Sequence, residues 1–409
     1  MPKTKVEEEL KQGEALSIIN LVDALVEDAY SARASDIHID PEEKRLRVRL
    51  RIDGVLHESF IFPAEIHSEI ISRIKVLSGL RTDEHQAAQD GRFRAIIKIA
   101  ATAIPVDVRV SITPTYYGEN AVLRLLTEKT EKFSLETSGF SNNDKKRISD
   151  AIKKPYGMIL STGPTGSGKT TLLYTLIKKI NTPEVSIVTI EDPIEYSIAG
   201  INQIQINPHT DLTFARGLRS ILRQDPNIIM VGEIRDNETA AISVNAALTG
   251  HLILSTLHTN DAATTLPRLL DMKVEPFLIA STVNIAIGQR LVRKICPDCK
   301  VKKQITEDEI NSFTGIIPEK ILAQIKNKNF YQGAGCEKCD KSGYYSRIGI
   351  YEVLKVDDDI RKAIVRKADV SEIREIAVKN GMTTIIEDGF KKALDGITTI
   401  EEVLRVIHD

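Results

Sequence analysis

The run Gly163-Pro164-Thr165-Gly166-Ser167-Gly168-Lys169-Thr170 places the strongest constraint on what this chain can fold into. It follows an apolar stretch at 156–162, which predicts a strand, and precedes a helical pattern at 170–180. The glycines let successive backbone N–H groups face one anion, and Lys169 adds a positive charge. A strand, such a loop and a helix in this order are typical of proteins that bind nucleotide phosphates, whereas a chance glycine turn would lack these flanks.

The alternation of strand and helix continues beyond this loop. Apolar runs at 185–190, 228–231 and 251–257 predict strands, and amphipathic stretches at 212–223 and 238–248 predict helices. This pattern predicts right-handed crossovers and a mostly parallel sheet covered on both faces. Because ligands collect at the carboxyl ends of such strands, we expect the residues after each strand to surround the loop.

Polar residues follow three of the expected strands. We expect Glu233 to position the attacking water, the alternative being an ion pair with a nearby arginine. Glu191 is expected to order the waters bound to a metal ion, unless it is a solvated loop acid. His258 is within expected reach of a γ-phosphate, although a lone histidine is more often structural. Lys169 and these three residues form the predicted catalytic set.

The hydroxyl of Thr170 is the expected Mg²⁺ ligand, and Thr171 is the next residue of the predicted phosphate-binding segment. No Asn-Lys-x-Asp guanine reader occurs, so ATP is favoured over GTP by absence alone.

Arginines supply the charge that stabilises a transferring phosphoryl group. Arg219 and Arg223 are four residues apart on an expected helix, and Arg235 follows Glu233 by two. Arg109 and Arg124 lie in otherwise apolar runs, where an unpaired cation is costly. Their anionic counterpart is either an acid in their own domain or the nucleotide.

The first part of the chain has a different pattern. Residues 15–32 carry an apolar stripe of helical period, and the following runs alternate with period two: 36–40, 46–52, 55–60 and 93–99. Asp53-Gly54 between two of them is a hairpin signal. We expect residues 1–14 to be disordered, residues 15–127 to form a small α+β domain, and a charged linker at 128–138 to follow it.

The four cysteines form two C-x-x-C pairs, Cys296 with Cys299 and Cys336 with Cys339, separated by 36 residues. Four thiolates in this pattern suit tetrahedral Zn²⁺, the alternatives being redox-active or inert thiols. Two disulfides are disfavoured in a cytosolic chain. The segment 291–345 is therefore predicted to be a zinc-binding module, followed by a helical region at 346–409 with its best periods at 360–365 and 400–407.

Composition excludes other classes. The 409 residues carry 55 Lys and Arg against 57 Asp and Glu, a formal net charge of −2. This balance, with 10 Phe, 10 Tyr and no Trp, argues against nucleic-acid binding. No apolar run approaches the roughly 18 residues that a membrane helix needs. Residues 1–13 are charged where a secretory signal has an apolar core, so a cytosolic location is expected.

Assembled, several ordered blocks resemble the secretion ATPase superfamily of type II secretion and type IV pilus assembly. Besides the phosphate loop, the matching blocks are Ser35 to Ile39, Arg51 to Leu56, Gln89 to Arg92, Thr189 to Glu195, Leu222 to Pro226, Gly232 to Asp236, Gly250-His251, Thr256 to Asp261 and Gln289 to Leu291. The resemblance implies a PAS-like α+β domain, a RecA-like α/β motor domain at 139–290 and a hexamer. It also implies that arginines of the first domain complete the nucleotide site.

The resemblance implies a function as well. Such a motor hydrolyses ATP on the cytoplasmic face of the inner membrane and acts through a membrane platform protein on pilin-like subunits. The cysteine module is typical of assembly and secretion members rather than pilus retraction members. Longer members carry a further N-terminal domain that docks on the membrane apparatus. Only about 14 residues precede the first expected helix here, so the chain is either naturally short or trimmed, and recruitment through the platform protein alone is the expectation for a naturally short chain. The alternatives are a nucleic-acid translocase or DNA-uptake motor and a nucleotide-gated scaffold without turnover.

Overall fold

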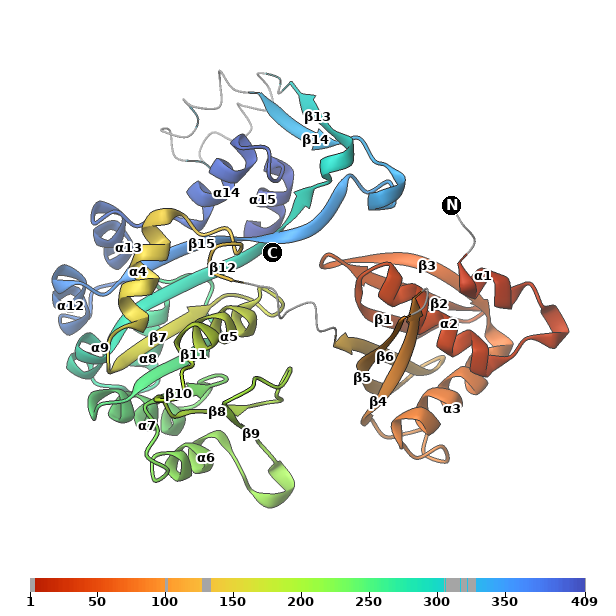
Figure 1. Cartoon of the computed structure of the whole chain (residues 1–409), viewed down its shortest axis with the longest axis horizontal. Helices are drawn as coiled ribbons and strands as arrows, with labels where there is room; N and C mark the ends of the chain where they lie inside the picture. The colour runs from red at the N-terminus through yellow and green to blue at the C-terminus, as the bar shows by residue number, and fades with distance from the viewer. Residues whose placement is uncertain are drawn as a thin grey trace. The chain divides into compact units, whose positions relative to one another are not determined.

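The computed structural model describes residues 4–99, 102–126, 134–304, 306, 317, 322 and 329–408. The chain divides into two compact units, Met1–Glu131 and Lys132–Asp409 (Figure 1). Of the predicted linker 128–138, residues 128–133 lie outside the described residues, and so do most residues between 305 and 328 of the predicted zinc module.

The first unit is built on a six-stranded antiparallel sheet with the strand order β3-β2-β1-β6-β5-β4. Its strands are β1 (Ala34–Pro41), β2 (Arg45–Ile52), β3 (Val55–Pro63), β4 (Gln89–Ile99), β5 (Thr102–Thr115) and β6 (Gly118–Leu126). Its helices are α1 (Lys5–Leu10), α2 (Ile18–Ser31) and α3 (His67–Ser78). The helix and the strands predicted here from periodicity are confirmed.

Alternation along the strands decides which face of this sheet is buried. In β2, Leu46, Val48 and Leu50 are buried, and arginines alternate with them on the other face. The buried residues share one core with the apolar stripe of α2, which includes Leu21 and Leu25. Burying this stripe against the sheet stabilises both elements.

The prediction that residues 1–14 are disordered is wrong for α1. Thr4 caps this helix through a reciprocal pair of hydrogen bonds with Glu7, and Val6 is fully buried in the core of the first unit. The sequence carried the signal, because Ser or Thr followed three residues later by Glu marks a helix start. The charged composition of the segment concealed it.

The second unit contains a seven-stranded sheet with the order β15-β12-β7-β11-β10-β8-β9. Its strands are β7 (Gly157–Thr162), β8 (Ile187–Glu191), β9 (Asn202–Gln205), β10 (Ile228–Val231), β11 (Leu252–Leu257), β12 (Val283–Ile295) and β15 (Tyr344–Lys355). All neighbouring pairs are parallel except β12 with β15. The predicted α/β class with a mostly parallel sheet is confirmed.

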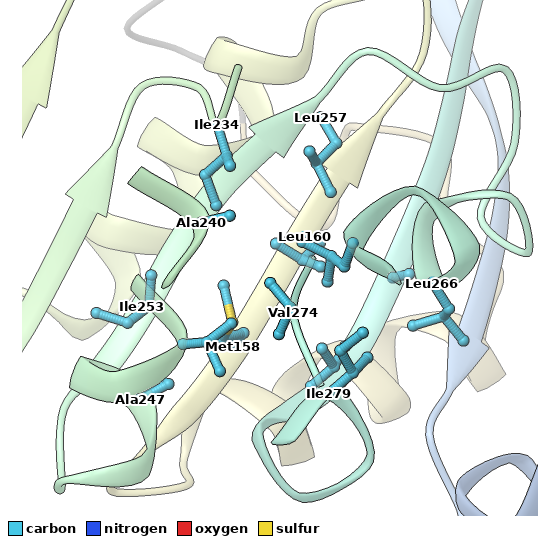
Figure 2. Close-up of a cluster of buried hydrophobic side chains, with 14 of the residues drawn as sticks. Met158, Leu160, Ile234, Ala240, Ala247, Ile253, Leu257, Leu266, Val274 and Ile279 are labelled. Carbon is cyan, nitrogen blue, oxygen red and sulfur yellow. The ribbon is translucent and has the colours of Figure 1, made fainter. Parts of the chain in front are cut away.

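Helices cover both faces of this sheet. Successive residues of β7 enter different cores: Met158 and Leu160 pack with α7 (Asn237–Leu248), α8 (Thr265–Asp271) and α9 (Pro276–Thr282), whereas Ile159 packs with α4 (Asn142–Ile152) and α5 (Lys169–Ile180). Figure 2 shows the first of these cores, where Leu160 lies near Leu266. Two buried faces explain the uninterrupted apolar runs of the strands. Packing on both faces also holds β7, the strand that leads into the phosphate loop, in place.

Two predicted module boundaries are wrong. The boundary between 290 and 291 cuts β12, and the boundary between 345 and 346 cuts β15, so the supposed helical region begins as a strand. These two strands pair antiparallel along most of their length. Their pairing joins segments that are far apart in the sequence, which local periodicity does not reveal.

The remaining elements complete the second unit. They are α6 (Phe214–Ile221), α12 (Asp358–Val365), α13 (Val370–Lys379), α14 (Ile385–Leu394), α15 (Ile400–His408) and a two-stranded sheet of β13 (Lys300–Lys303) and β14 (Phe330–Gly333). The helices predicted at 360–365 and 400–407 are confirmed. Among the described residues, no helix combines the length and apolar character that a membrane crossing requires.

Candidate nucleotide site and metal centre

The predicted phosphate loop lies between β7 and α5. Gly163, Gly166 and Gly168 have φ angles of +143°, +79° and +88°, a region that favours glycine. A Cβ on Gly163 would lie 2.4 Å from the carbonyl oxygen of Gln289, so a side chain at this position would displace the backbone. Glycine therefore lets the loop pass closely over β12.

Lys169 turns its side chain back into the loop. Its Nζ donates to the carbonyl oxygens of Gly163 at 2.7 Å and Pro164 at 3.0 Å. Burial lowers the pKa of Lys169, and the carboxylate of Glu233 opposes this effect. Within the described part of the chain, the ammonium has no carboxylate within ion-pair distance, and the buried Oγ of Ser167 has no hydrogen-bond partner. Both features fit a phosphate held at the start of α5.

The remaining loop residues occupy the positions that the motif predicts. Pro164, Thr165 and Gly166 are exposed, and Thr170 and Thr171 lie partly exposed in the first turn of α5. The hydroxyl of Thr170 is thus available at the helix start, where the predicted Mg²⁺ would bind.

Glu233 follows β10 and meets two of the predicted residues. Its Oε2 lies 2.8 Å from Nε2 of His258, and its Oε1 lies 2.5 Å from a guanidinium nitrogen of Arg235. The side chain of Glu233 is only 11% exposed, whereas His258 is half exposed. The hydrogen bond to Glu233 raises the pKa of Arg235. The ion pair with an arginine that we gave as the alternative for Glu233 is therefore present. The other carboxylate oxygen of Glu233 faces His258.

Glu191 ends β8, but its carboxylate faces a different set of residues. Tyr174 of α5 donates its hydroxyl to Oε2, and Thr189 donates to Oε1 at 2.6 Å. Gln203 of β9 donates to the same Oε1 at 3.2 Å. Glu191 is 2% exposed, so it is not the solvated loop acid that we gave as the alternative. These contacts connect α5 and β9 to the end of β8, and the role of Glu191 in ordering metal-bound water stays a prediction.

Two of the predicted arginines lie on the surface. Arg219 of α6 pairs with Glu238 of α7 at 2.6 Å, with both side chains half exposed or more. Arg223 lies beyond the end of α6, not inside the predicted helix 212–223, and donates to the carbonyl oxygen of Arg219 at 2.9 Å. The structure does not bring either residue into contact with Lys169 or Glu233.

Arg109 and Arg124 lie side by side in the sheet of the first unit. The strand register pairs Arg124 of β6 with Arg109 of β5 and with Asp36 of β1. The Nε of Arg124 lies 2.9 Å from Oδ1 of the buried Asp36, so the predicted acid in the same domain exists for Arg124. The register extends this row to Arg51 and Arg92. This row therefore contains four guanidinium groups and one carboxylate.

The four cysteines converge, as predicted. Cys296 and Cys336 have their Sγ atoms 3.8 Å apart, as do Cys299 and Cys339, and all four Sγ atoms lie within 4.8 Å of one another. A disulfide would require about 2.0 Å, so the thiols are free. A tetrahedron with Zn–S bonds of about 2.3 Å has S···S edges of about 3.8 Å. The arrangement therefore fits one tetrahedral Zn²⁺.

One buried residue near the loop has a role that we did not predict from the sequence. Gln289 of β12 is 3% exposed and donates its side-chain amide to the carbonyl oxygen of Ser167 at 2.6 Å. A polar residue inside a buried strand was the available signal, since such a group needs a hydrogen-bond partner. Gln289 therefore connects β12 to the phosphate loop and fixes the orientation of the Ser167 carbonyl group.

Known proteins are similar in sequence to this chain over nearly its full length. Residues 11–405 match the family model described as "Type II/IV secretion system protein". The type IV pilus assembly ATPase PilB of Thermus thermophilus is 48% identical over 383 residues, which make up 94% of this chain and 42% of that protein. The type II secretion system protein E of Dickeya dadantii is 46% identical over 393 residues, or 96% of this chain and 76% of that protein.

Solved structures share the fold. The ATPase DotB of Legionella pneumophila is 24% identical, with a TM-score of 0.67 over 94% of this chain and 95% of that chain. The pilus retraction motor PilT with bound ADP is also 24% identical, with a TM-score of 0.62 over 94% and 96%. Identities this low support the fold alone. Because the family model covers nearly all residues and both curated relatives exceed 45% identity, the chain belongs to the type II/IV secretion system protein family.

Proposed function

We propose that this chain hydrolyses ATP as the motor of a type IV pilus assembly or type II secretion system. The single observation that carries the proposal is the hydrogen bond between Glu233, which follows β10, and His258, which follows β11, the neighbour in the sheet of the strand that leads into the phosphate loop. A cation for phosphate and a carboxylate for water then meet at one edge of the sheet. The names of the relatives agree with this activity.

Four residues around the phosphate loop would have separate roles in hydrolysis. Lys169 exchanges the carbonyls of Gly163 and Pro164 for oxygens of the β- and γ-phosphates. The hydroxyl of Thr170 would hold Mg²⁺, which neutralises charge on these oxygens. Glu233 accepts a proton from the attacking water, while His258 keeps one of its carboxylate oxygens in place.

The tetra-cysteine group would hold a structural Zn²⁺. Four thiolates leave no open ligand position, so the ion would stabilise the fold without taking part in hydrolysis. The cysteines lie at the ends of β12 and β15 and in the segments that continue from them. Zinc would therefore fix these strand ends to β13 and β14.

The wider system is inferred from the family. We expect a hexamer at the cytoplasmic face of the inner membrane, acting through a platform protein on pilin-like subunits. Arg109 and Arg124, which the register pairs in the sheet of the first unit, stay predicted phosphate-binding residues. Arg235 contacts Glu233, and its role toward nucleotide stays a prediction. The roles of Arg219 and Arg223 stay predictions.

Glu233→Gln tests the proposal. The variant should bind ATP but turn over about 10²- to 10⁴-fold more slowly, the usual contribution of such a group. Glu275→Gln is the matched control, because Glu275 is an exposed acid of the same unit that makes no side-chain hydrogen bond or ion pair to a described residue. Near-normal turnover in Glu233→Gln would refute the assignment, and stimulation of the parent protein by single-stranded DNA would support the nucleic-acid translocase instead.

A further inference from the structure

The loop that carries His258 is attached at its start to the phosphate-binding strand. Thr162, the last residue of β7, donates its hydroxyl to the carbonyl oxygen of Thr259 at 2.6 Å and accepts the N–H of Thr259 at 3.1 Å. The hydroxyl of Thr259 also lies 3.0 Å from the hydroxyl of Thr265 in α8. All three threonines are buried. His258 is thus held next to a residue that directly precedes the phosphate loop.

The same loop has a second attachment, to the C-terminal part of the chain. The carboxylate of Asp261 lies 2.5 Å from a guanidinium nitrogen of Arg374 in α13. The backbone N–H of Ala262 donates to Oε1 of Glu352 in β15 at 2.6 Å. Asp261 is three residues from His258, so both ends of one short segment are fixed, one by β7 and the other by β15 and α13.

The contact with Glu352 requires a specific arrangement of its neighbours. Glu352 is 4% exposed and faces Gly288 of β12 across the antiparallel pair. A Cβ on Gly288 would lie 2.8 Å from Cγ of Glu352 and 3.1 Å from the backbone nitrogen of Ala262. Burial raises the pKa of Glu352, and the N–H of Ala262 opposes this effect. A buried carboxylate is costly, so its persistence needs donors such as this N–H.

We propose that Arg374 and Glu352 are positioning residues for His258, and that through it they set the orientation of Glu233. Displacement of β15 or α13 then moves Asp261 and Ala262, and the segment passes this movement to His258. The C-terminal part of the chain would thereby control hydrolysis without touching nucleotide. This inference rests on the proposed ATP hydrolysis.

Arg374→Gln is the principal test, because the side chain of Arg374 is 43% exposed and the carboxylate of Asp261 keeps the hydrogen bonds from Thr264 when Arg374 is replaced. The variant should bind an ATP analogue within about twofold of the parent, while kcat falls about 10-fold, since small misplacements of catalytic groups are costly. Arg374→Lys, which keeps the charge, should recover part of this loss. Arg366→Gln is the matched control: it removes an exposed arginine that pairs with Glu372 of α13, and kcat should not change.

A double-mutant cycle shows whether Arg374 acts through His258. In the His258→Ala background, Arg374→Gln should change kcat by less than about twofold, because the residue that it positions is gone. An equal loss of kcat in both backgrounds, or no loss in the parent background, would overturn the inference. Absence of ATP turnover in the parent protein would instead refute the proposed function, and this inference with it.

Glu352 provides an independent readout, needed if His258→Ala has too little turnover to measure. Glu352→Gln keeps an oxygen that accepts the N–H of Ala262, whereas Glu352→Met keeps only the approximate shape. We expect kcat near the parent value for Glu352→Gln and about 10-fold lower for Glu352→Met, with ATP-analogue binding retained in both. Equal kcat values for the two folded variants would contradict a positioning role.

Discussion

Replacing Tyr174 with Phe removes one oxygen atom from the network that surrounds Glu191. The hydroxyl donates to Oε2 of Glu191 and accepts from the backbone N–H of Glu195 at 3.4 Å and from Gln203 at 3.3 Å. Burial and the adjacent Glu191 raise the pKa of Tyr174, so the phenol stays protonated and donates. Because Glu191 is 2% exposed, water cannot readily replace the lost donor.

The loss can be estimated from these contacts. A hydrogen bond to a charged group contributes about 1.5–3 kcal/mol, and leaving a buried carboxylate oxygen without a donor places the cost in the upper half of that range. We therefore expect Tyr174→Phe to lower the free energy of unfolding of the second unit by about 2–3 kcal/mol. In a domain of this size, each kcal/mol lowers Tm by about 2–4 °C, which gives a decrease of about 4–12 °C.

Differential scanning calorimetry of the whole chain measures this change. The transition of the second unit can be identified because a nucleotide analogue bound to the phosphate loop should raise its Tm. Tyr156→Phe is the matched control: Tyr156 lies in the same unit, is 52% exposed, and its hydroxyl has no hydrogen bond to a described residue. It should change stability by less than about 0.5 kcal/mol. Equal Tm values for the two variants would refute the estimate.

Three further predictions address charge and metal. Arg109→Gln and Arg124→Gln should each lower ATP turnover without changing the Tm of the second unit. Unchanged turnover in both variants would mean that the two arginines form structural ion pairs only. The double variant with Cys296→Ser and Cys299→Ser should no longer bind Zn²⁺ and should become sensitive to protease between residues 296 and 339. Zinc binding contributes an apparent free energy of about 10–16 kcal/mol in small zinc domains. Burial raises the pKa of Glu352 above its usual 4.5, so stability from this group is present below that value and is lost as pH rises through the raised pKa. The free energy of unfolding of Glu352→Gln relative to the parent should thus increase in denaturant titrations as the pH rises above 4.5, and a constant difference would contradict the shift.

The sequence predicts the central strands of the second unit well because each is buried on both faces. Such strands are short apolar runs, and their carboxyl ends must meet at one edge of the sheet. That reasoning places Lys169, Glu233 and His258 together without any knowledge of their contacts. The same reasoning fails for β12 and β15, whose polar residues are satisfied by partners distant in the sequence, such as Gln289 by the phosphate loop.

Side-chain direction is the part of the site that strand position does not determine. Glu191 ends β8 and Glu233 follows β10, its neighbour in the sheet, yet the two carboxylates belong to different hydrogen-bond networks. Side chains two residues apart point to the same face of a strand, and Thr189 accordingly donates to Glu191 on the side of Tyr174. Glu233 lies two residues beyond the end of β10, where this alternation no longer applies, and turns toward His258 instead. An acidic residue at the end of a strand therefore predicts proximity to the nucleotide site, whereas its chemical role depends on which donors surround its carboxylate.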